Sequence, residues 1–435
     1  MTNFSPSMKT LRALITASCA CVILSAPMVA QTPAENTPQF GFSLKTPPGE
    51  SSKKVSEPTS PKNNAAGLPP PDDTIRVDTS LVVLDVTVTD ASGQKYITGL
   101  SKDDFTLAED NQPQTVATLT LGDDTARLPR SIVLIFDRSD SELPYLESSI
   151  DAARTLVNQL TPSDEMAIVT DDIELASGFT KDKKKLKQTL DALKKLTLTG
   201  FHTRSMQFSA LLATLRELID TRTKRPIIIL QTDGDEVLRL SPSAPQRPSN
   251  YDMETVYAEV EKSRTRIYTV VPGQRLTGLP KDEVAKRVTL MMEMARLARA
   301  RNKDMWYGYE RLPPKPSNNP QSQIPEGLLQ QMIEKMREQA AKRFELACES
   351  RVLGQAAAAR VAELTGGWTS FLEKPEQANE IYGRILADIN HRYILSYYPT
   401  NKEPDGKLRS VRIEVRGHPE YSVKGRTSYY ATPKE

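Results

Sequence analysis

The segment SIVLIFDRSDSELP, residues 131–144, places an apolar run directly before three oxygen-bearing side chains. An apolar run without polar alternation indicates a strand that is buried on both faces of a sheet. Asp137, Ser139 and Ser141 follow at alternate positions, on the loop at the carboxyl end of that strand. They offer one carboxylate and two hydroxyl groups, which are hard oxygen ligands suited to Mg²⁺ or Mn²⁺. The segment therefore predicts both a buried strand and a cation site at its end.

The chain around this segment alternates between strand and helix patterns. Buried strands are predicted at 131–137, 166–170, 226–230 and 266–272, and helices at 145–160, 181–196, 205–221 and 252–263. Strands that are separated by helices indicate a parallel sheet covered on both faces, which is a doubly wound α/β domain. In such sheets, ligands bind at the carboxyl ends of the strands.

Two further oxygen-bearing residues are predicted at the same edge of the sheet. Asp233 follows a buried strand within PIIILQTDGDE, and Thr203 lies in a loop that precedes a helix. The predicted cation ligands are Asp137, Ser139, Ser141, Thr203 and Asp233.

Segments with period-two alternation stand on both sides of the α/β pattern. They cover residues 75–125 and 391–432, and each has too few strands for a sandwich. We predict one β-sandwich built from both segments, with the α/β domain at 130–390 inserted between them. Two separate small sheets are the alternative.

A helical insertion at 281–350 interrupts the α/β pattern. Helices are predicted at 281–303 and 326–364, separated by a proline-rich segment that breaks any helix. The two helices either pack on each other and on the domain, or project as a hairpin that binds a partner. We favour packing, because basic residues such as Arg296 are typical of a solvated face.

The amino terminus has the pattern of an export signal. Residues 1–30 combine Lys9 and Arg12 with a short apolar segment, and cleavage after Ala30 predicts a periplasmic or secreted protein without a membrane span. Residues 31–74 are rich in proline and serine, which predicts a disordered linker.

Composition and motifs narrow the function classes. A net charge of +2 gives no reason to expect a nucleic-acid partner. The chain has 3 histidines and none of the common hydrolase or nucleotide-binding motifs, so we expect a protein that is not an enzyme.

The acidic and hydroxyl residues resemble the metal-ion-dependent adhesion site of von Willebrand factor A domains. In that family, a D-x-S-x-S loop, a threonine and a further aspartate hold a divalent cation, whose open position takes a carboxylate of a protein partner. The resemblance implies Mg²⁺ or Mn²⁺ bound by Asp137, Ser139 and Ser141 from the first motif, Asp233 within TDGD from the third, and Thr203 from the second, with Thr199 as its substitute.

From residue 75 onward the chain is similar to exported bacterial proteins with von Willebrand A-related domains, known chiefly from acidobacteria. The similar stretches include LVVLDVTVTDASGQKYITGLSKDDFTLAEDNQPQ, ELTGGWTSF and RYILSYYPTNKEPDGKLRSVRIEVRG. The resemblance implies an adhesion-type binding module. The alternative is a cell-envelope scaffold whose site is degenerate and metal-free, because Asp140 replaces a glycine of the family's loop and Arg138 could neutralise Asp137. Glu142 could add attraction for a cation.

Overall fold

The computed structural model describes residues 43–45, 81–121, 130–139, 141–197, 205–219, 225–238, 240, 251–301 and 326–431. The predicted export signal lies outside these residues, as does the predicted linker except for 43–45. Within that short stretch, the Lys45 N–H donates to the Ile173 carbonyl over 2.9 Å, and Lys45 forms a parallel bridge with Glu174. Lys45, which lies in the segment that we predicted to be disordered, is thus held against the domain.

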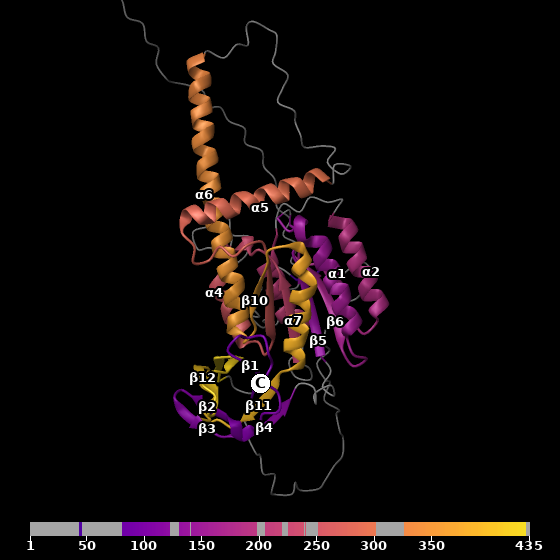
Figure 1. The fold of residues 1–435 in the computed structure, drawn as a ribbon, viewed down its shortest axis with the longest axis vertical. Helices are drawn as coiled ribbons and strands as arrows, with labels where there is room; N and C mark the ends of the chain where they lie inside the picture. The colour runs from indigo at the N-terminus through magenta and orange to yellow at the C-terminus, as the bar shows by residue number, and fades with distance from the viewer. Residues whose placement is uncertain are drawn as a thin grey trace, which may run out of the picture. The chain divides into compact units, whose positions relative to one another are not determined.

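A six-stranded sheet forms the centre of the α/β region (Figure 1). Its strands are β5 (Arg130–Phe136), β6 (Glu165–Thr170), β7 (Leu175–Thr180), β8 (Arg225–Gln231), β9 (Arg266–Pro272) and β10 (Thr369–Leu372). They lie in the order β10-β9-β8-β5-β6-β7, and only β7 is antiparallel to its neighbour. The prediction of an α/β fold with a mostly parallel sheet is confirmed at this level, although β7 was not among the predicted strands.

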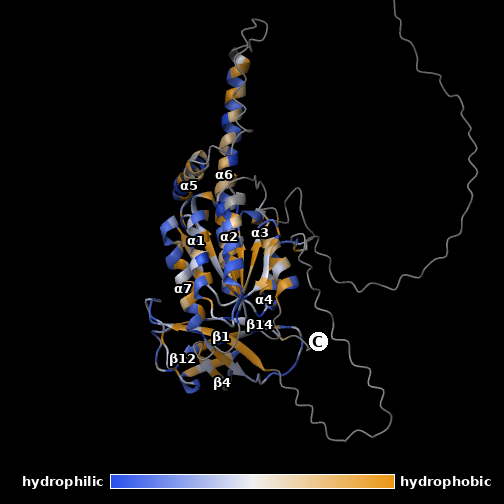
Figure 2. Ribbon diagram, turned by 90° about the vertical axis from the view of Figure 1, so that its right-hand side faces the viewer, coloured by the Kyte–Doolittle hydropathy of each residue, from blue (hydrophilic) through white to orange (hydrophobic). Residues whose placement is uncertain are grey.

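Helices cover both faces of this sheet. One face packs against α1 (Leu143–Gln159), α2 (Lys183–Thr197) and α7 (Ala378–Asn390), and the other packs against α3 (Gln207–Ala213), the π-helical turn Thr214–Leu218, α4 (Met253–Lys262) and the end of α6 (Glu326–Leu364). Successive residues of β5 divide between the two apolar clusters: Leu134 belongs to the first and Val133 to the second. Figure 2 shows these apolar strands between helices whose outer surfaces are hydrophilic. Burial on both faces explains the unbroken apolar run in the sequence.

Two antiparallel sheets combine strands from both flanks of the α/β region. One has the order β13-β1-β11-β4, and the other has the order β14-β12-β2-β3. The amino-terminal flank supplies β1 (Val82–Thr89), β2 (Phe105–Glu109), β3 (Gln112–Gln114) and β4 (Val116–Leu121), and the carboxyl-terminal flank supplies β11 (Tyr393–Tyr397), β12 (Leu408–Val415), β13 (Ser422–Gly425) and β14 (Ser428–Tyr430). Leu84, Phe105 and Val411 belong to one apolar cluster that the two sheets share. Each sheet takes strands from both flanks, so neither flank alone can form this core.

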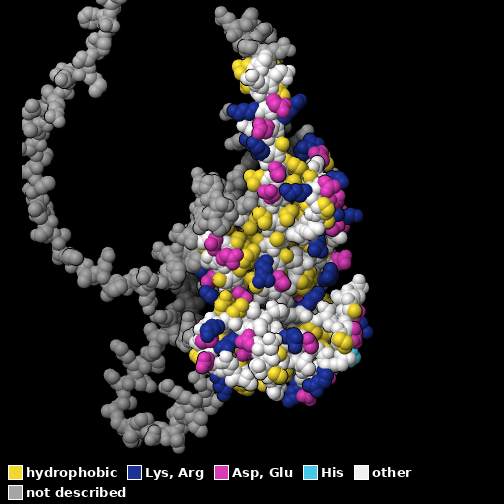
Figure 3. Space-filling view, turned by 90° about the vertical axis from the view of Figure 1, so that its left-hand side faces the viewer, with side chains coloured by type: hydrophobic (Ala, Val, Ile, Leu, Met, Phe, Trp, Pro, Cys, Tyr) yellow, Lys and Arg dark blue, Asp and Glu magenta, His cyan; other side chains and the backbone are white. Residues whose placement is uncertain are grey.

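The helical insertion is packed at its base and exposed beyond it. α5 (Lys281–Arg301) contributes Val288 and Met291 to an apolar cluster, against which Phe344 and Cys348 of α6 pack. Nearer the start of α6, Leu328, Leu329, Met332 and Met336 are 42–66% exposed. Figure 3 shows hydrophobic and charged side chains interspersed along this helix. The two helices therefore pack on each other through this cluster, and the start of α6 is exposed. Among the described helices, none is both long and apolar enough to cross a bilayer.

One buried guanidinium joins the α/β region to the antiparallel sheets. Arg266, at the start of β9, is 2% exposed, and its Nη2 lies 3.2 Å from Oδ2 of Asp388 in α7. The same side chain donates to the Asp85 carbonyl over 3.3 Å and to the Thr87 hydroxyl over 3.1 Å, both in β1. The Tyr268 hydroxyl donates to Asp388 over 2.6 Å. Three elements thus depend on one ion pair.

We expect the substitution Asp388→Asn to lower the free energy of unfolding by about 3–5 kcal/mol, because the buried Arg266 loses its charge partner. Urea unfolding measures this change. Glu414→Gln is the control: Glu414 pairs with Arg412 over 3.6 Å on the surface, so its loss should cost less than about 0.5 kcal/mol. Equal stability of Asp388→Asn and the wild type would contradict the assigned role.

Candidate metal centre

The strand order places the candidate site where the direction of the sheet's growth reverses. From β5 the chain builds β6 and β7 on one side, and then β8, β9 and β10 on the other. Ligands of doubly wound sheets bind at the carboxyl ends of the two strands beside such a reversal. Asp137 directly follows β5, and Asp233 lies two residues after β8. Both predicted carboxylates therefore occupy the crevice that the topology favours.

Asp137 is fully buried and held in place by two donors. The Thr232 hydroxyl donates to Oδ2 over 2.9 Å, and the Ser139 N–H donates to Oδ1 over 2.9 Å. Burial raises the pKa of Asp137 well above its usual value, and the carboxylates of Asp171 and Asp233 raise it further. The fold thus fixes a carboxylate where its charge is poorly compensated.

Three buried carboxylates converge at this point. Asp137, Glu142 and Asp233 each offer an oxygen, and these oxygens lie within 4.8 Å of one another. Neither oxygen of Glu142 has a hydrogen-bond partner in the part of the chain that the structure describes. Burial raises the pKa of Glu142 well above its usual value, and the charges of Asp137 and Asp233 raise it further. The nearby Gln231 amide lowers it, although the amide forms no hydrogen bond with Glu142. The sequence analysis noted Glu142 only as an added attraction for cations.

Two hydroxyl groups belong to the loop that follows Asp137. The Ser139 and Ser141 Oγ atoms are 3.1 Å apart, and the buried Ser139 belongs to the same loop as Asp137. Thr203, its substitute Thr199 and the loop residue Asp140 lie outside the described residues. Of the five predicted ligands, the structure thus brings Asp137 and Asp233 together and has Ser139 and Ser141 on the loop after Asp137. The prediction for Thr203 stays untested.

Arg138 pairs with carboxylates other than that of Asp137. Its side chain is 2% exposed, with Nη2 3.0 Å from Asp172 Oδ1 and Nε 3.5 Å from Asp171 Oδ1. Two successive aspartates after β6, Asp171 and Asp172, thus supply the partners of Arg138. Neutralisation of Asp137 by Arg138, one basis for a degenerate site, does not match these ion pairs.

The guanidinium that reaches the site comes instead from α6. Arg351 Nη1 lies 3.3 Å from Asp233 Oδ2, and the two side chains are 18% and 5% exposed. Nothing in the sequence pattern pointed to Arg351, because it lies 118 residues from Asp233 and belongs to another element.

Close backbone packing holds α6 against the Asp233 loop. A Cβ atom on Gly354 would lie 2.5 Å from the Asp233 carbonyl oxygen and 2.7 Å from that of Gly234. Gly234 also has a φ of +76°, a conformation that side chains disfavour. Glycine at both positions thus lets α6 bring Arg351 to the candidate site. We call this edge of the sheet, where β5 and β8 end, the rim.

The residues present fit a divalent cation. Three buried carboxylates face one guanidinium, so the cluster has more negative charge than Arg351 compensates. The unpartnered oxygens of Glu142 and the neighbouring serine hydroxyls are hard donors, which Mg²⁺ and Mn²⁺ prefer.

Comparisons with known proteins give only remote similarities. No family model and no curated protein matches the sequence. Among solved structures, the conserved hypothetical protein BatB from Bacteroides thetaiotaomicron is 14% identical, with 40% of this chain and 97% of that chain covered and a TM-score of 0.27. The vWF domain of the type V pili tip protein Mfa5 from Porphyromonas gingivalis is 15% identical, with 42% and 97% covered and a TM-score of 0.27. The pilus adhesin SpaC from Lactobacillus rhamnosus GG is 12% identical, with 41% and 30% covered and a TM-score of 0.27.

These TM-scores are too low to support an argument about fold or function. The class is therefore defined by this chain's own strand order and contacts. It is a doubly wound α/β domain with an acidic, hydroxyl-lined rim, joined to antiparallel sheets.

We expect Glu142→Gln to raise the thermal stability of the protein in EDTA, because it removes a buried charge that lies beside two others. The expected gain is about 1–3 kcal/mol. The same substitution should reduce the stabilisation by Mn²⁺, because one cation ligand is weakened. Thermal unfolding in EDTA and in Mn²⁺ measures both effects.

Glu147→Gln serves as the matched control on the same helix, because Glu147 is 72% exposed and pairs with Lys194 at the surface. If Glu142→Gln is less stable than the wild type in EDTA and responds to Mn²⁺ as the wild type does, the claim that repulsion between these carboxylates destabilises the fold is wrong.

Proposed function

We propose that the protein is an exported binding module that grips a carboxylate of a protein partner through a divalent cation. The proposed cation ligands are Asp137, Ser139, Ser141, Thr203 and Asp233, with Glu142 beside them. The observation that carries the proposal is the convergence of three buried carboxylates at the strand-order reversal, where one guanidinium compensates only part of their charge. A bound cation would be the largest positive charge at the rim and would attract an acidic partner group.

The residues of the chain have distinct parts in this proposal. Thr232 and the Ser139 N–H orient Asp137, so its carboxylate is preorganised for the cation. Glu142 contributes charge from the start of α1, where burial strengthens its attraction for a cation. Mg²⁺ and Mn²⁺ supply an electrophilic centre with room for an oxygen ligand from outside the chain.

Binding rather than catalysis is supported by the positions of the histidines. Of the two in the described part of the chain, His391 caps the end of α7, and His418 stacks on Tyr421 in the turn between β12 and β13. Neither stands at the rim to act as a general base. His202 lies outside the described residues.

A cell-envelope scaffold with a metal-free site is the second candidate. The ion pair between Arg351 and Asp233 favours it, because this guanidinium already compensates part of the charge that a cation would take. The two candidates differ in one measurable property, the response of folding stability to divalent cations.

We expect Mg²⁺ or Mn²⁺ to stabilise the wild type against thermal unfolding, by about 2.7 kcal/mol at a hundredfold excess over Kd. Asp137→Ala should abolish this response. Arg351→Gln should strengthen it, because the competing guanidinium is removed. Arg360→Gln is the control, since Arg360 lies on the same helix and pairs with Glu363 at the surface. Identical unfolding curves in EDTA and in both cations would favour the scaffold.

The partner is expected to supply an aspartate or glutamate. Selection of a displayed peptide library against the full chain in Mg²⁺ should enrich acidic peptides. Replacement of the acidic residue by its amide, or addition of EDTA, should then abolish binding. Peptides that bind equally well in EDTA would contradict cation-mediated capture, even if the cation stabilises the fold.

A further inference from the structure

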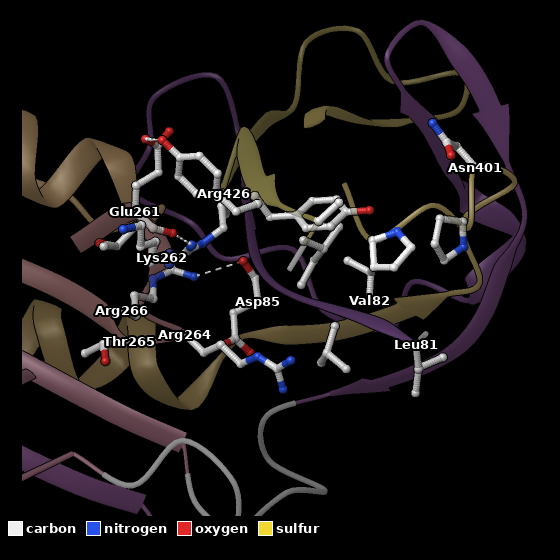
Figure 4. Close-up of a pocket in the computed structure, with 18 of the residues that line it drawn as sticks. Leu81, Val82, Asp85, Glu261, Lys262, Arg264, Thr265, Arg266, Asn401 and Arg426 are labelled. Carbon is white, nitrogen blue, oxygen red and sulfur yellow. Dashed lines mark hydrogen bonds between the residues drawn. The ribbon is translucent and has the colours of Figure 1, made fainter. Parts of the chain in front are cut away.

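A cavity of about 340 Å³ lies between the antiparallel sheets and the α/β region (Figure 4). Its walls include β1, the end of α4, the start of β9 and the loop after β11. Because β9 starts at this cavity and ends toward the rim, the cavity lies at the opposite end of the strand from the candidate metal centre. It is therefore a separate feature, and its size is within the range of small-molecule sites.

Part of the cavity wall is apolar and aromatic. The lining includes Leu81, Val83, Pro399, Pro404, Tyr429 and Tyr430. Val83 is 48% exposed and Leu81 is 39% exposed, so apolar side chains are open to an occupant. Such a wall favours an aromatic or branched hydrocarbon body.

The wall holds three acidic side chains, Asp85, Glu261 and Glu403, and the first two already have donors. Glu261 accepts hydrogen bonds from the Ser428 hydroxyl over 2.8 Å and from the Tyr430 hydroxyl over 3.4 Å. Asp85 Oδ2 lies 3.6 Å from Nη1 of Arg392. Neither carboxylate depends on the cavity for a partner.

Two guanidiniums in the wall have no carboxylate partner among the residues that the structure describes. Arg426 donates to the Glu261 and Ser263 carbonyls and forms no ion pair within the described ranges. Burial lowers the pKa of Arg426 to about 10. The charges of Asp85 and Glu261 oppose this shift, and the charge of Arg264 adds to it. Arg264 is exposed in the wall and likewise forms no ion pair with a described residue. An anion would compensate both charges.

We propose that this cavity binds a small organic carboxylate with an aromatic or branched apolar body. The carboxylate pairs with Arg426 and Arg264, and the apolar body lies against the tyrosines and prolines. A single negative charge fits best, because Asp85 and Glu261 stand close enough to repel a dianion such as phosphate. The proposal is independent of a cation at the rim.

The test measures the binding of four carboxylates to the full chain: benzoate, phenylacetate, indole-3-acetate and hexanoate. The primary amide of each acid is the uncharged control. Ligand-observed NMR titration in EDTA gives the affinities. At least one acid should bind with a Kd of about 1 mM or tighter, and its amide should bind about tenfold more weakly, because it cannot form the charge-assisted hydrogen bonds.

Three variants locate the binding. Arg264→Gln, at an exposed position that the fold does not depend on, should weaken binding of the acid about tenfold. Arg426→Gln should weaken it further where that variant folds, and Val83→Trp should abolish it by filling the cavity. Arg412→Gln, on the exposed face of β12, should bind like the wild type. Failure of every acid to bind, equal binding of acid and amide, or binding that survives Val83→Trp would overturn the proposal.

Discussion

The mutual repulsion of three buried carboxylates is the constraint on which the candidate metal centre depends. Asp137, Glu142 and Asp233 approach within 4.8 Å at the point where two neighbouring strands end, and Glu142 has no hydrogen-bond partner in the described part of the chain. A fold retains such crowding only when the rest of the structure enforces it. Here the enforcement comes from the parallel pairing of β5 with β8 and from the immediate start of α1 after the loop. The raised pKa values of Asp137 and Glu142 have the same origin.

The helix α6, which begins in the helical insertion and continues beyond it, is part of this arrangement. Gly354 packs so tightly against the Asp233 loop that a methyl group would not fit, and Arg351 supplies the charge that faces Asp233. Toward its start, the same helix presents Leu329, Met332 and other apolar side chains that are 42% exposed or more. One continuous helix thus carries both an exposed apolar surface and the guanidinium that pairs with Asp233. The rim cannot be understood from the D-x-S-x-S loop alone.

Local patterns in the sequence predicted the parts of the fold that local physics determines. The unbroken apolar runs indicated strands buried on both faces, and the alternating flanks indicated the antiparallel sheets; Asp137 and Asp233 followed from their positions at strand ends. Contacts between distant segments left no such pattern. The ion pair of Arg351 with Asp233 is one example, and the turn of Arg138 toward residues 171–172 is another. The strand β7 was missed because LASGFT is short and has small and polar residues at its centre, a weak signal for a strand.

The most direct test of the central claim is anomalous X-ray diffraction from crystals of the protein grown with Mn²⁺. A Mn²⁺ ion has a strong anomalous signal, and its position is independent of any assumption about the partner. We predict one anomalous peak, marking a Mn²⁺ ion bound by oxygens of Asp137 and Asp233. Glu142 should point toward this ion, and Arg351 should be displaced from Asp233. A map without a peak at this rim, in which Arg351 still pairs with Asp233, would contradict the claim that these carboxylates form a cation site.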